Sequence, residues 1–402
     1  MRFLKIAGLI TIVLMFGLTL SMFAQDGATN NTILSILNVQ KYERAVHIMA
    51  MLILGFGFLM VFVKRYGRSA LTATFLLVSI AIPLYFMLSH LYFLNGSVVP
   101  IDKIILAEFA AASLLITAGA VLGRLKMQQY MILGVLFVAT YMVNEWIVIN
   151  GATTLIPVKG FADTGGSIVI HAFGAIFGLS VSFFLTRKLD LELPIESDAT
   201  SDRYSMLGSM VLWVFWPSFC SALVEPNLVP VTIINVIMAL CGSTVATYVI
   251  SVLKRGKISI ADIANASLAG GVAIGSTCDH ASPIASIVIG ILAGIISTLG
   301  FAAFQGRMQK TLTLVDTCGV SNLHGFPGLL GGFAAMFLVS GINVSYQFTG
   351  IIITIIIAFA GGFITSKILS LFGTNPRPYV DASEFLEAEY EFDIDEKVKH
   401  TV

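Results

Sequence analysis

The feature that most limits what this chain can fold into is a series of apolar stretches, each about as long as a membrane-crossing helix of roughly 20 residues. Alternation of apolar and polar residues, which is typical of membrane β-barrel strands, is absent. The sequence therefore predicts an all-α polytopic membrane protein. The stretches lie at about 4–24, 43–63, 71–94, 104–123, 128–150, 165–186, 205–225, 230–253, 260–277, 283–304, 323–341 and 348–372.

Composition excludes the soluble classes of protein. Of the 402 residues, 57% are hydrophobic and only 11% are charged, whereas an average soluble domain carries roughly 25% charged residues. Disordered chains and nucleic-acid-binding domains need a high net charge, and here 23 bases balance 23 acids. The sequence contains no nucleophile paired with a base and no metal-type cluster, so we expect neither an enzyme nor a cofactor.

The first apolar stretch has the layout of a secretory signal peptide. Arg2 and Lys5 precede an apolar run over 6–20, and small and polar residues follow up to Ala24. This order of basic, apolar and small-residue regions is typical of a cleaved signal. We therefore expect removal of residues 1–24 and eleven spans in the mature chain, with a retained helix as the alternative.

The basic residues predict the orientation of the spans. Seventeen Lys and Arg residues fall in one set of alternate loops and the tail, and four fall in the other set. Cytoplasmic loops carry the excess of basic residues. We therefore expect a multi-pass protein of the bacterial inner (plasma) membrane, with the N-terminus outside and the C-terminus in the cytoplasm. Residues 373–402, rich in acids, form the expected cytoplasmic tail, either solvated or acting as a regulatory or docking element.

Two segments of the chain repeat each other. Asp163 begins a D-T-G-G motif and is followed eight residues later by His171, and Asp316 begins a D-T-C-G motif followed eight residues later by His324. The spacing between the aspartates and between the histidines is 153 residues in both cases. Because the matching residues are of functional types, the repeat points to a site rather than to chance similarity.

The repeat also predicts geometry. In the transmembrane region 25–372 we expect a first half at about 43–190, a second half at about 200–342, and a last helix at about 348–372. Five helices in each half would place the second half upside down relative to the first. Transporters built from such inverted repeats hold their site near the membrane midplane, between the halves.

Each histidine lies eight residues beyond its aspartate, which corresponds to about 12 Å of helix. His171 and His324 are therefore expected to meet near the midplane, coming from opposite faces. Two facing imidazoles could share a proton and offer hydrogen bonds to a small polar substrate. Asp163 and Asp316 are expected to cap the starts of their helices, and Asp163 could also attract a cation at the outer mouth.

At these residues the chain resembles the Amt/Mep/Rh family of ammonium transporters, in the Rhesus branch. The resemblance points to a bacterial Rhesus-type homologue. The similarity covers about residues 40–372. Besides the two motifs above, it rests on the segments 215–219, 294–301 and 322–328. The resemblance implies the ammonium transporter fold, with eleven helices in each subunit of a homotrimer.

The resemblance also implies roles for individual residues. His171 and His324 match the family's twin histidines, Asp163 matches its aspartate at a helix start, and Phe109 and Phe219 match its phenylalanine gate. Ammonium would lose its proton near the outer mouth, and neutral ammonia would pass through an apolar pore. The segment 149–152 lacks the tryptophan that the Amt branch places there, so the resemblance implies low-affinity conduction.

Two alternatives remain at this stage. The substrate could instead be methylamine or carbon dioxide. In a different class of protein, a redox subunit, two midplane histidines could be the axial ligands of a haem.

Overall fold

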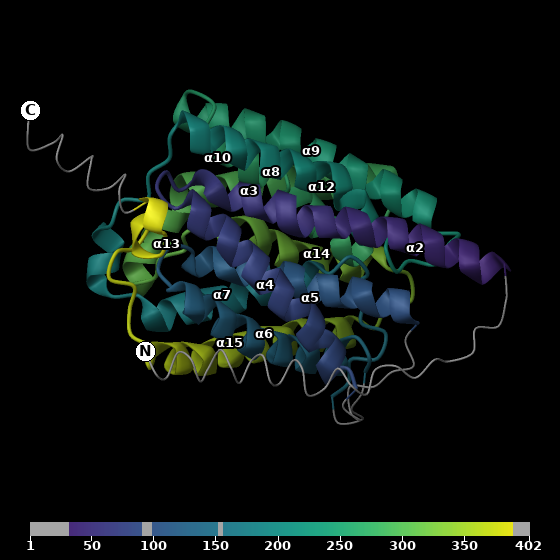
Figure 1. Cartoon of the computed structure of the whole chain (residues 1–402). Helices are drawn as coiled ribbons and strands as arrows, with labels where there is room; N and C mark the ends of the chain where they lie inside the picture. The colour runs from purple at the N-terminus through teal and green to yellow at the C-terminus, as the bar shows by residue number, and fades with distance from the viewer. Residues whose placement is uncertain (1–31, 91–98, 152–155, 389–402) are drawn as a thin grey trace, which may run out of the picture.

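In a computed structural model, the chain forms a bundle of helices that run roughly along one common direction (Figure 1). The structure describes residues 32–90, 99–151 and 156–388. The expected signal peptide at 1–24 lies outside the described residues. Helices α9 and α10 lie at one edge of the bundle, and α6 and α15 lie at the opposite edge (Figure 1).

The described part of the first half of the chain is helical, and some of its long helical stretches are built from several segments. Between the last of these and the second half lies the short 3-10 helix η5 (Lys188–Glu192). The segments are α2 (Thr32–Ala50), η1 (Met51–Phe56), α3 (Gly57–Leu59), η2 (Met60–Phe62), α4 (Gly67–Leu88), α5 (Pro100–Val121), α6 (Met127–Val148), η4 (Ser167–Ala172) and α7 (Phe173–Leu185).

The second half is helical in the same way, and one further long helix follows it. Its segments are α8 (Ala199–Cys220), α9 (Val229–Arg255), α10 (Ile260–Ala266), α11 (Ala269–Ile274), η6 (Gly275–Thr277), α12 (Pro283–Leu299), η7 (Gly300–Phe304), α13 (Gln305–Leu312), η8 (Ser321–Gly325) and α14 (Phe326–Leu338). The chain then continues through α15 (Val344–Ser370) and the short η9 (Asp381–Ser383).

By length and composition, 8 helices in the described part of the chain are long and apolar enough to cross a membrane. The other three expected stretches are helical as well: α8 covers the one at 205–225, the broken series α10–α11–η6 covers 260–277, and η8 with α14 covers 323–341. The all-helical, multi-span class is therefore confirmed. The count of eleven spans remains a prediction for these three segments.

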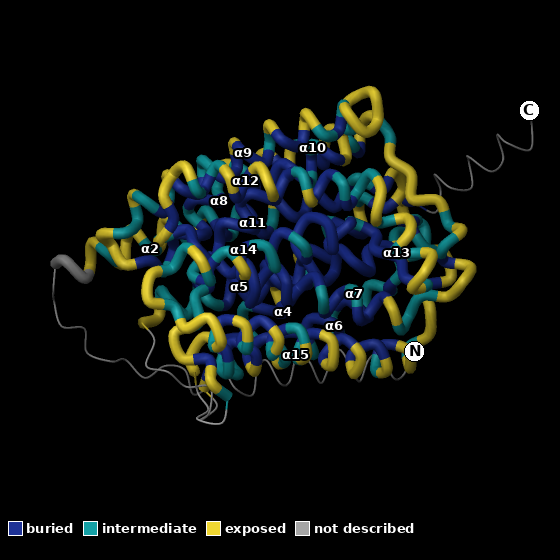
Figure 2. Tube along the Cα trace, turned by 180° about the vertical axis from the view of Figure 1, so that it is seen from behind, coloured by how far each residue is buried: buried dark blue, intermediate teal, exposed yellow. Residues whose placement is uncertain are grey.

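Burial separates central helices from peripheral ones. In the most apolar 18-residue stretch of α5, 89% is buried, whereas in the corresponding stretch of α15 only 39% is buried. Figure 2 shows buried segments gathered in the middle of the bundle and exposed residues along its outer helices and at its ends. The helices α5 and α11 therefore lie where a pathway through the protein would be enclosed.

Small residues bring the helix backbones into close contact in the second half. The α9–α12 pair is the clearest example, because a Cβ added at Gly290 would lie 2.0 Å from the carbonyl oxygen of Ala239. Helix interfaces in membranes commonly use small residues in this way. Glycine at this position is therefore needed for the two backbones to approach each other.

We expect Gly290→Ala to lower the thermal stability of the purified protein, because α9 and α12 must move apart to admit the methyl group. Overpacking of this kind costs about 1–3 kcal/mol. The matched control is Gly306→Ala, where nothing lies within 4 Å of the added Cβ and alanine favours a helix by up to about 1 kcal/mol. Equal melting temperatures for the two variants would contradict the close packing.

The described part of the C-terminal tail, residues 373–388, packs against the bundle at some positions and is exposed at others, and its role stays a prediction. Tyr379 is 5% exposed and Asp381 is 8% exposed. The Asp381 carboxylate accepts hydrogen bonds from the backbone N–H groups of Arg68 and Ser69, at the start of α4. The acids in this region therefore do not simply repel one another in water, because one of them caps a helix of the bundle.

Candidate functional site

The structure brings the two repeat histidines into contact in the middle of the bundle. His171 lies in η4 and His324 lies in η8. Their Nδ1 atoms are 3.2 Å apart and their rings are stacked with centroids 5.3 Å apart. Both side chains are buried, with 2% and 4% of their surface exposed. One imidazole therefore donates a hydrogen bond to the other, and each keeps its Nε2 for a further contact.

The start of η4 explains how His171 is positioned. Gly166 has φ +76°, a left-handed conformation that favours glycine, and lets the chain turn into the helix. The Asp163 carboxylate accepts hydrogen bonds from the N–H groups of Ile168 and Val169. It also accepts one from the hydroxyl of Ser276, at 2.5 Å, in the short helix η6 of the second half. Asp163 therefore caps its own helix and joins the two halves of the bundle.

The start of η8 has the same construction. Gly319, 153 residues after Gly166, also adopts a left-handed conformation, with φ +69°. The Asp316 carboxylate accepts hydrogen bonds from the N–H groups of Val320 and Ser321. Both histidines lie on π-helical segments, which are rare and occur frequently at functional sites. The sequence repeat is thus a repeat of local structure.

Aromatic rings lie on either side of the two histidines and form with them a row of neighbouring rings, which we call the column. The rings of Phe109 and Phe219 are 4.6 Å apart, and Phe219 lies 6.1 Å from the ring of His171. On the other side, Phe56 stacks on His324 at 6.3 Å. The two phenylalanines that the resemblance selected therefore lie in direct contact, at the end of the column next to His171.

His171 and a further ring, Trp216, each carry a buried polar atom without a protein partner. Trp216 stacks on His171 with centroids 5.6 Å apart, and neither the Trp216 Nε1 nor the His171 Nε2 has a hydrogen-bond partner. Buried polar atoms are normally paired, so a small polar molecule could bind at this point. Trp216 and Phe56 gave no signal in the sequence beyond their residue types, and we did not select them as site residues.

A narrow cavity lies beside His324, on the side away from the phenylalanine pair. Its volume is about 20 Å³, and Phe56, Leu115, Ile116 and Gly119 contribute to its largely apolar wall. A single water needs a cavity of roughly 10–15 Å³ measured in this way. The space therefore fits one molecule of the size of water or ammonia.

Next to this cavity lies a wider one, whose mainly apolar lining also contains polar side chains. This second cavity, of about 150 Å³, shares Phe62, Asn265 and Cys318 with the first, and its lining includes Asp202 and Gln305. The site therefore combines a pair of phenylalanines, a pair of histidines, an apolar constriction and a wider cavity with some polar groups.

The geometry of the histidines does not suit a haem. Their Nδ1 atoms are 3.2 Å apart, which leaves no room for an iron atom and its porphyrin between the rings. Among the described residues, no group of three or more His, Cys, Asp and Glu side chains is arranged to hold a metal ion. The pair is therefore better suited to hydrogen bonding than to metal coordination.

Known proteins match this chain over most of its length. A family model described as the Ammonium Transporter Family matches residues 3–376. The Mus musculus protein "Ammonium transporter Rh type A" is 38% identical over 344 residues, which cover 83% of this chain and 77% of that protein. "Ammonium transporter Rh type B" of Oryctolagus cuniculus is 35% identical over 378 residues, which cover 85% and 79%.

Solved structures show the same fold. The structure of Nitrosomonas europaea Rh50, of the Rhesus protein family of channels, superposes with a TM-score of 0.87 at 49% identity and covers 91% of this chain and 98% of that one. A sensor Amt protein superposes with a TM-score of 0.73 over 84% and 94% of the chains. At 19% identity, the second likeness supports the fold alone.

Proposed function

This chain belongs to the ammonium transporter family, in its Rh branch, and from that premise we propose how its central column works. The protein conducts ammonium or ammonia across a membrane and is not an enzyme. We propose that ammonium loses its proton near Phe109 and Phe219 and that neutral ammonia then passes His171 and His324. The observation that supports this most is the contact between the two imidazoles, directly beside an apolar constriction.

The physical argument depends on charge. An ion without water or a counter-charge is strongly disfavoured in an apolar space, and the constriction beside His324 has room for about one small molecule. Ammonia is neutral and needs only a few hydrogen bonds on its way. The unpaired His171 Nε2 and Trp216 Nε1 supply polar contacts where the other walls of the column are aromatic.

The location and assembly of the protein follow from the same proposal. The distribution of basic residues supports an inner-membrane protein with its N-terminus outside and its tail in the cytoplasm. Asp163 would then lie toward the outer mouth, where its negative charge favours ammonium over anions. Family membership supports a homotrimer in which each subunit has its own pathway.

The test of the proposal is flux through proteoliposomes that contain the full-length protein. Stopped-flow measurement of internal pH after an ammonium gradient is expected to show faster alkalinisation than in empty vesicles. The same vesicles given a methylammonium or a carbon dioxide gradient distinguish the alternative substrates. No acceleration with ammonium, combined with acceleration by carbon dioxide, would overturn the proposed substrate.

A separate prediction concerns the phenylalanine pair. We expect Phe219→Ala to let ions leak, because removing the ring beside Phe109 opens a space that water can fill. The result is an ammonium-dependent current across a planar bilayer that is several-fold above that of the unmodified protein. The control is Phe348→Ala on α15, where the ring is 49% exposed and away from the column. Equal currents in the two variants would count against a gate at Phe219.

A further inference from the structure

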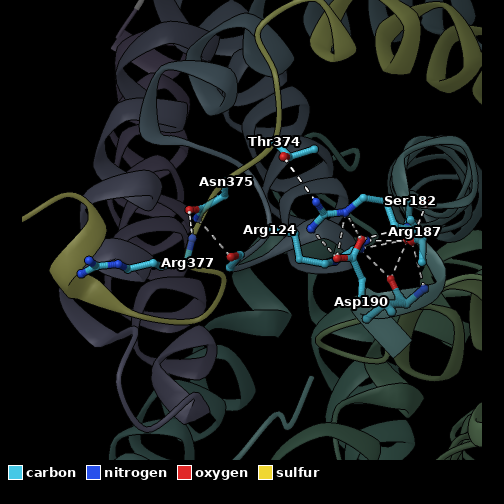
Figure 3. A network of polar contacts seen from close by, with 10 residues as sticks. Arg124, Ser182, Arg187, Asp190, Thr374, Asn375 and Arg377 are labelled. Atoms are coloured by element: carbon cyan, nitrogen blue, oxygen red, sulfur yellow. Dashed lines mark hydrogen bonds and ion pairs between the residues drawn. The ribbon is translucent and has the colours of Figure 1, made fainter. Parts of the chain in front are cut away.

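A cavity of about 190 Å³, separate from the ammonia pathway, lies where the ends of α5, α7 and α15 meet the start of α6. Its lining is amphipathic. Leu125, Phe184 and Leu185 form an apolar part, and Arg124 and Arg187 belong to the polar part. Figure 3 shows both arginines in one network of polar contacts that reaches Thr374 in the C-terminal segment.

Arg124 is fixed in place by this network. Its two Nη atoms donate to Thr186, Ser182 and the carbonyl oxygens of Ala120 and Val315. Its Nε–H is buried. Arg124 therefore contributes its positive charge to the lining of the cavity.

Arg187 is less constrained. Its Nε and Nη2 atoms donate to Asp190, but its Nη1 lies 3.4 Å from the Thr374 hydroxyl, a long contact. The side chain is 47% exposed, so its guanidinium remains accessible from the aqueous side of the cavity. One donor with a positive charge is therefore available to a ligand in the cavity.

The charge around the cavity is positive. Two guanidinium groups line it against one carboxylate, that of Asp190. Burial acts to raise the pKa of Asp190, but hydrogen bonds from Arg187 outweigh burial and hold that pKa below its ordinary value. Asp190 therefore stays ionised and compensates one arginine, and the charge of the other is left for an anion. The ammonium group of Lys126 lies close by, since it donates to the carbonyl oxygen of Phe372.

The surroundings place this cavity at the level of lipid headgroups. On the outside of α7 and α15, Phe183 and Phe363 are exposed by 41% and 39%. The Lys367 ammonium lies over the rings of Phe184 and Phe363, at 5.8 and 5.3 Å from their centroids. Aromatic and basic side chains are enriched together at the interface of a membrane with water.

We propose that this cavity binds a phosphate group at the cytoplasmic surface of the membrane. Arg187 Nη1 can donate to a phosphate oxygen, and charged donors make the stronger hydrogen bonds to such oxygens, while Arg124 adds a second positive charge beside it. The apolar part of the lining, formed by Leu125 and Phe184, suits the glycerol and upper acyl region of a phospholipid. The cytoplasmic side assigned to the cavity rests on the orientation given under the proposed function, whereas phosphate binding itself requires no conduction of ammonia.

A phosphate group bound in this cavity would connect three segments of the chain at the inner surface. Arg124 belongs to the α5–α6 connection, Arg187 follows α7, and Thr374 belongs to the C-terminal segment. Arg124 also holds the carbonyl oxygen of Val315, immediately before the Asp316 motif. A bound phosphate group is therefore expected to stabilise the folded protein as a whole, which gives a readout that does not require transport.

The experiment measures thermal unfolding of the full-length protein in detergent. The probes are dioctanoyl phosphatidylglycerol, dioctanoyl phosphatidylcholine, and potassium phosphate compared with potassium chloride at equal ionic strength. We expect phosphatidylglycerol to raise the melting temperature by several degrees over phosphatidylcholine. A matching rise with potassium phosphate identifies free phosphate as a sufficient ligand, and a rise with phosphatidylglycerol alone identifies the lipid. The proposal would be overturned if phosphatidylglycerol gave no rise over phosphatidylcholine and potassium phosphate gave none over potassium chloride.

Matched variants assign the effect to this cavity. Thr374 is exposed at its rim, so Thr374→Glu introduces a repelling charge and Thr374→Gln is its neutral counterpart. We expect Thr374→Glu to remove most of the rise in melting temperature and Thr374→Gln to keep it. Arg307→Gln removes an exposed charge of α13 and is expected to leave the rise intact. A rise lost equally in Arg307→Gln and Thr374→Glu would show general charge attraction and overturn the site.

Discussion

Replacing His171 or His324 by alanine is expected to lower ammonia flux through proteoliposomes by about ten-fold or more. The imidazoles are the polar groups between the phenylalanine pair and the apolar constriction. Without one of them, ammonia loses a hydrogen-bond partner inside the bundle, and the other imidazole loses its own. An unmade buried hydrogen bond costs about 1–3 kcal/mol, and about 1.4 kcal/mol in a barrier is ten-fold in rate.

The measurement is the rate of internal alkalinisation in stopped-flow experiments, normalised to the amount of protein in the vesicles. His90→Gln is the control, because His90 is exposed at the end of α4. His171→Gln keeps hydrogen-bonding groups in place and is expected to retain more flux than His171→Ala. Unchanged flux in both alanine variants, with normal protein content, would rule out a role for the histidines in conduction.

The second large effect concerns stability. We expect Asp163→Ala to destabilise the protein clearly, because a buried donor left without its acceptor costs about 1–3 kcal/mol and several donors point at this carboxylate. Two N–H groups at the start of η4 and the hydroxyl of Ser276 lose their acceptor. Because Ser276 belongs to the second half of the chain, the loss affects the contact between the two halves as well as the helix itself.

Melting temperature and the yield of intact protein are the readouts for this variant. Asp163→Asn keeps the shape and one acceptor oxygen and is expected to lie between Asp163→Ala and the unmodified protein. The control is Asp102→Asn, which breaks a partly exposed ion pair with Lys41 that is worth roughly 0–1 kcal/mol. If Asp163→Ala melted at the same temperature as Asp102→Asn, the aspartate would not join the halves as described.

The course of the chain and the centre of the site could be predicted from the sequence. Apolar length alone located the helical stretches, because a membrane leaves few alternatives to a helix. The 153-residue spacing then paired His171 with His324, since equal offsets in two copies of one motif place equivalent residues at equivalent depths. Both inferences depend on patterns that are local in the sequence or repeated in it.

Other features could not be predicted, because they arise only from tertiary contacts. Nothing near Trp216 or Phe56 in the sequence indicates that these rings lie beside the histidines. Nothing in the acid-rich composition of the tail indicates that Asp381 caps α4, more than 300 residues earlier in the chain. A contact at that distance has no signature in a single sequence.

The π-helical segments under the two histidines have a consequence for how the fold tolerates change. A π turn is wider than an α turn and commonly corresponds to one additional residue, and one residue rotates a helix by about 100°. In η4 and η8 the direction of the imidazole and the packing face of the following helix are therefore set separately. For this reason the length of these two segments is fixed more strictly than the identity of most residues in them. Deleting one residue would turn one imidazole away from its partner, while α7 or α14 kept its neighbours.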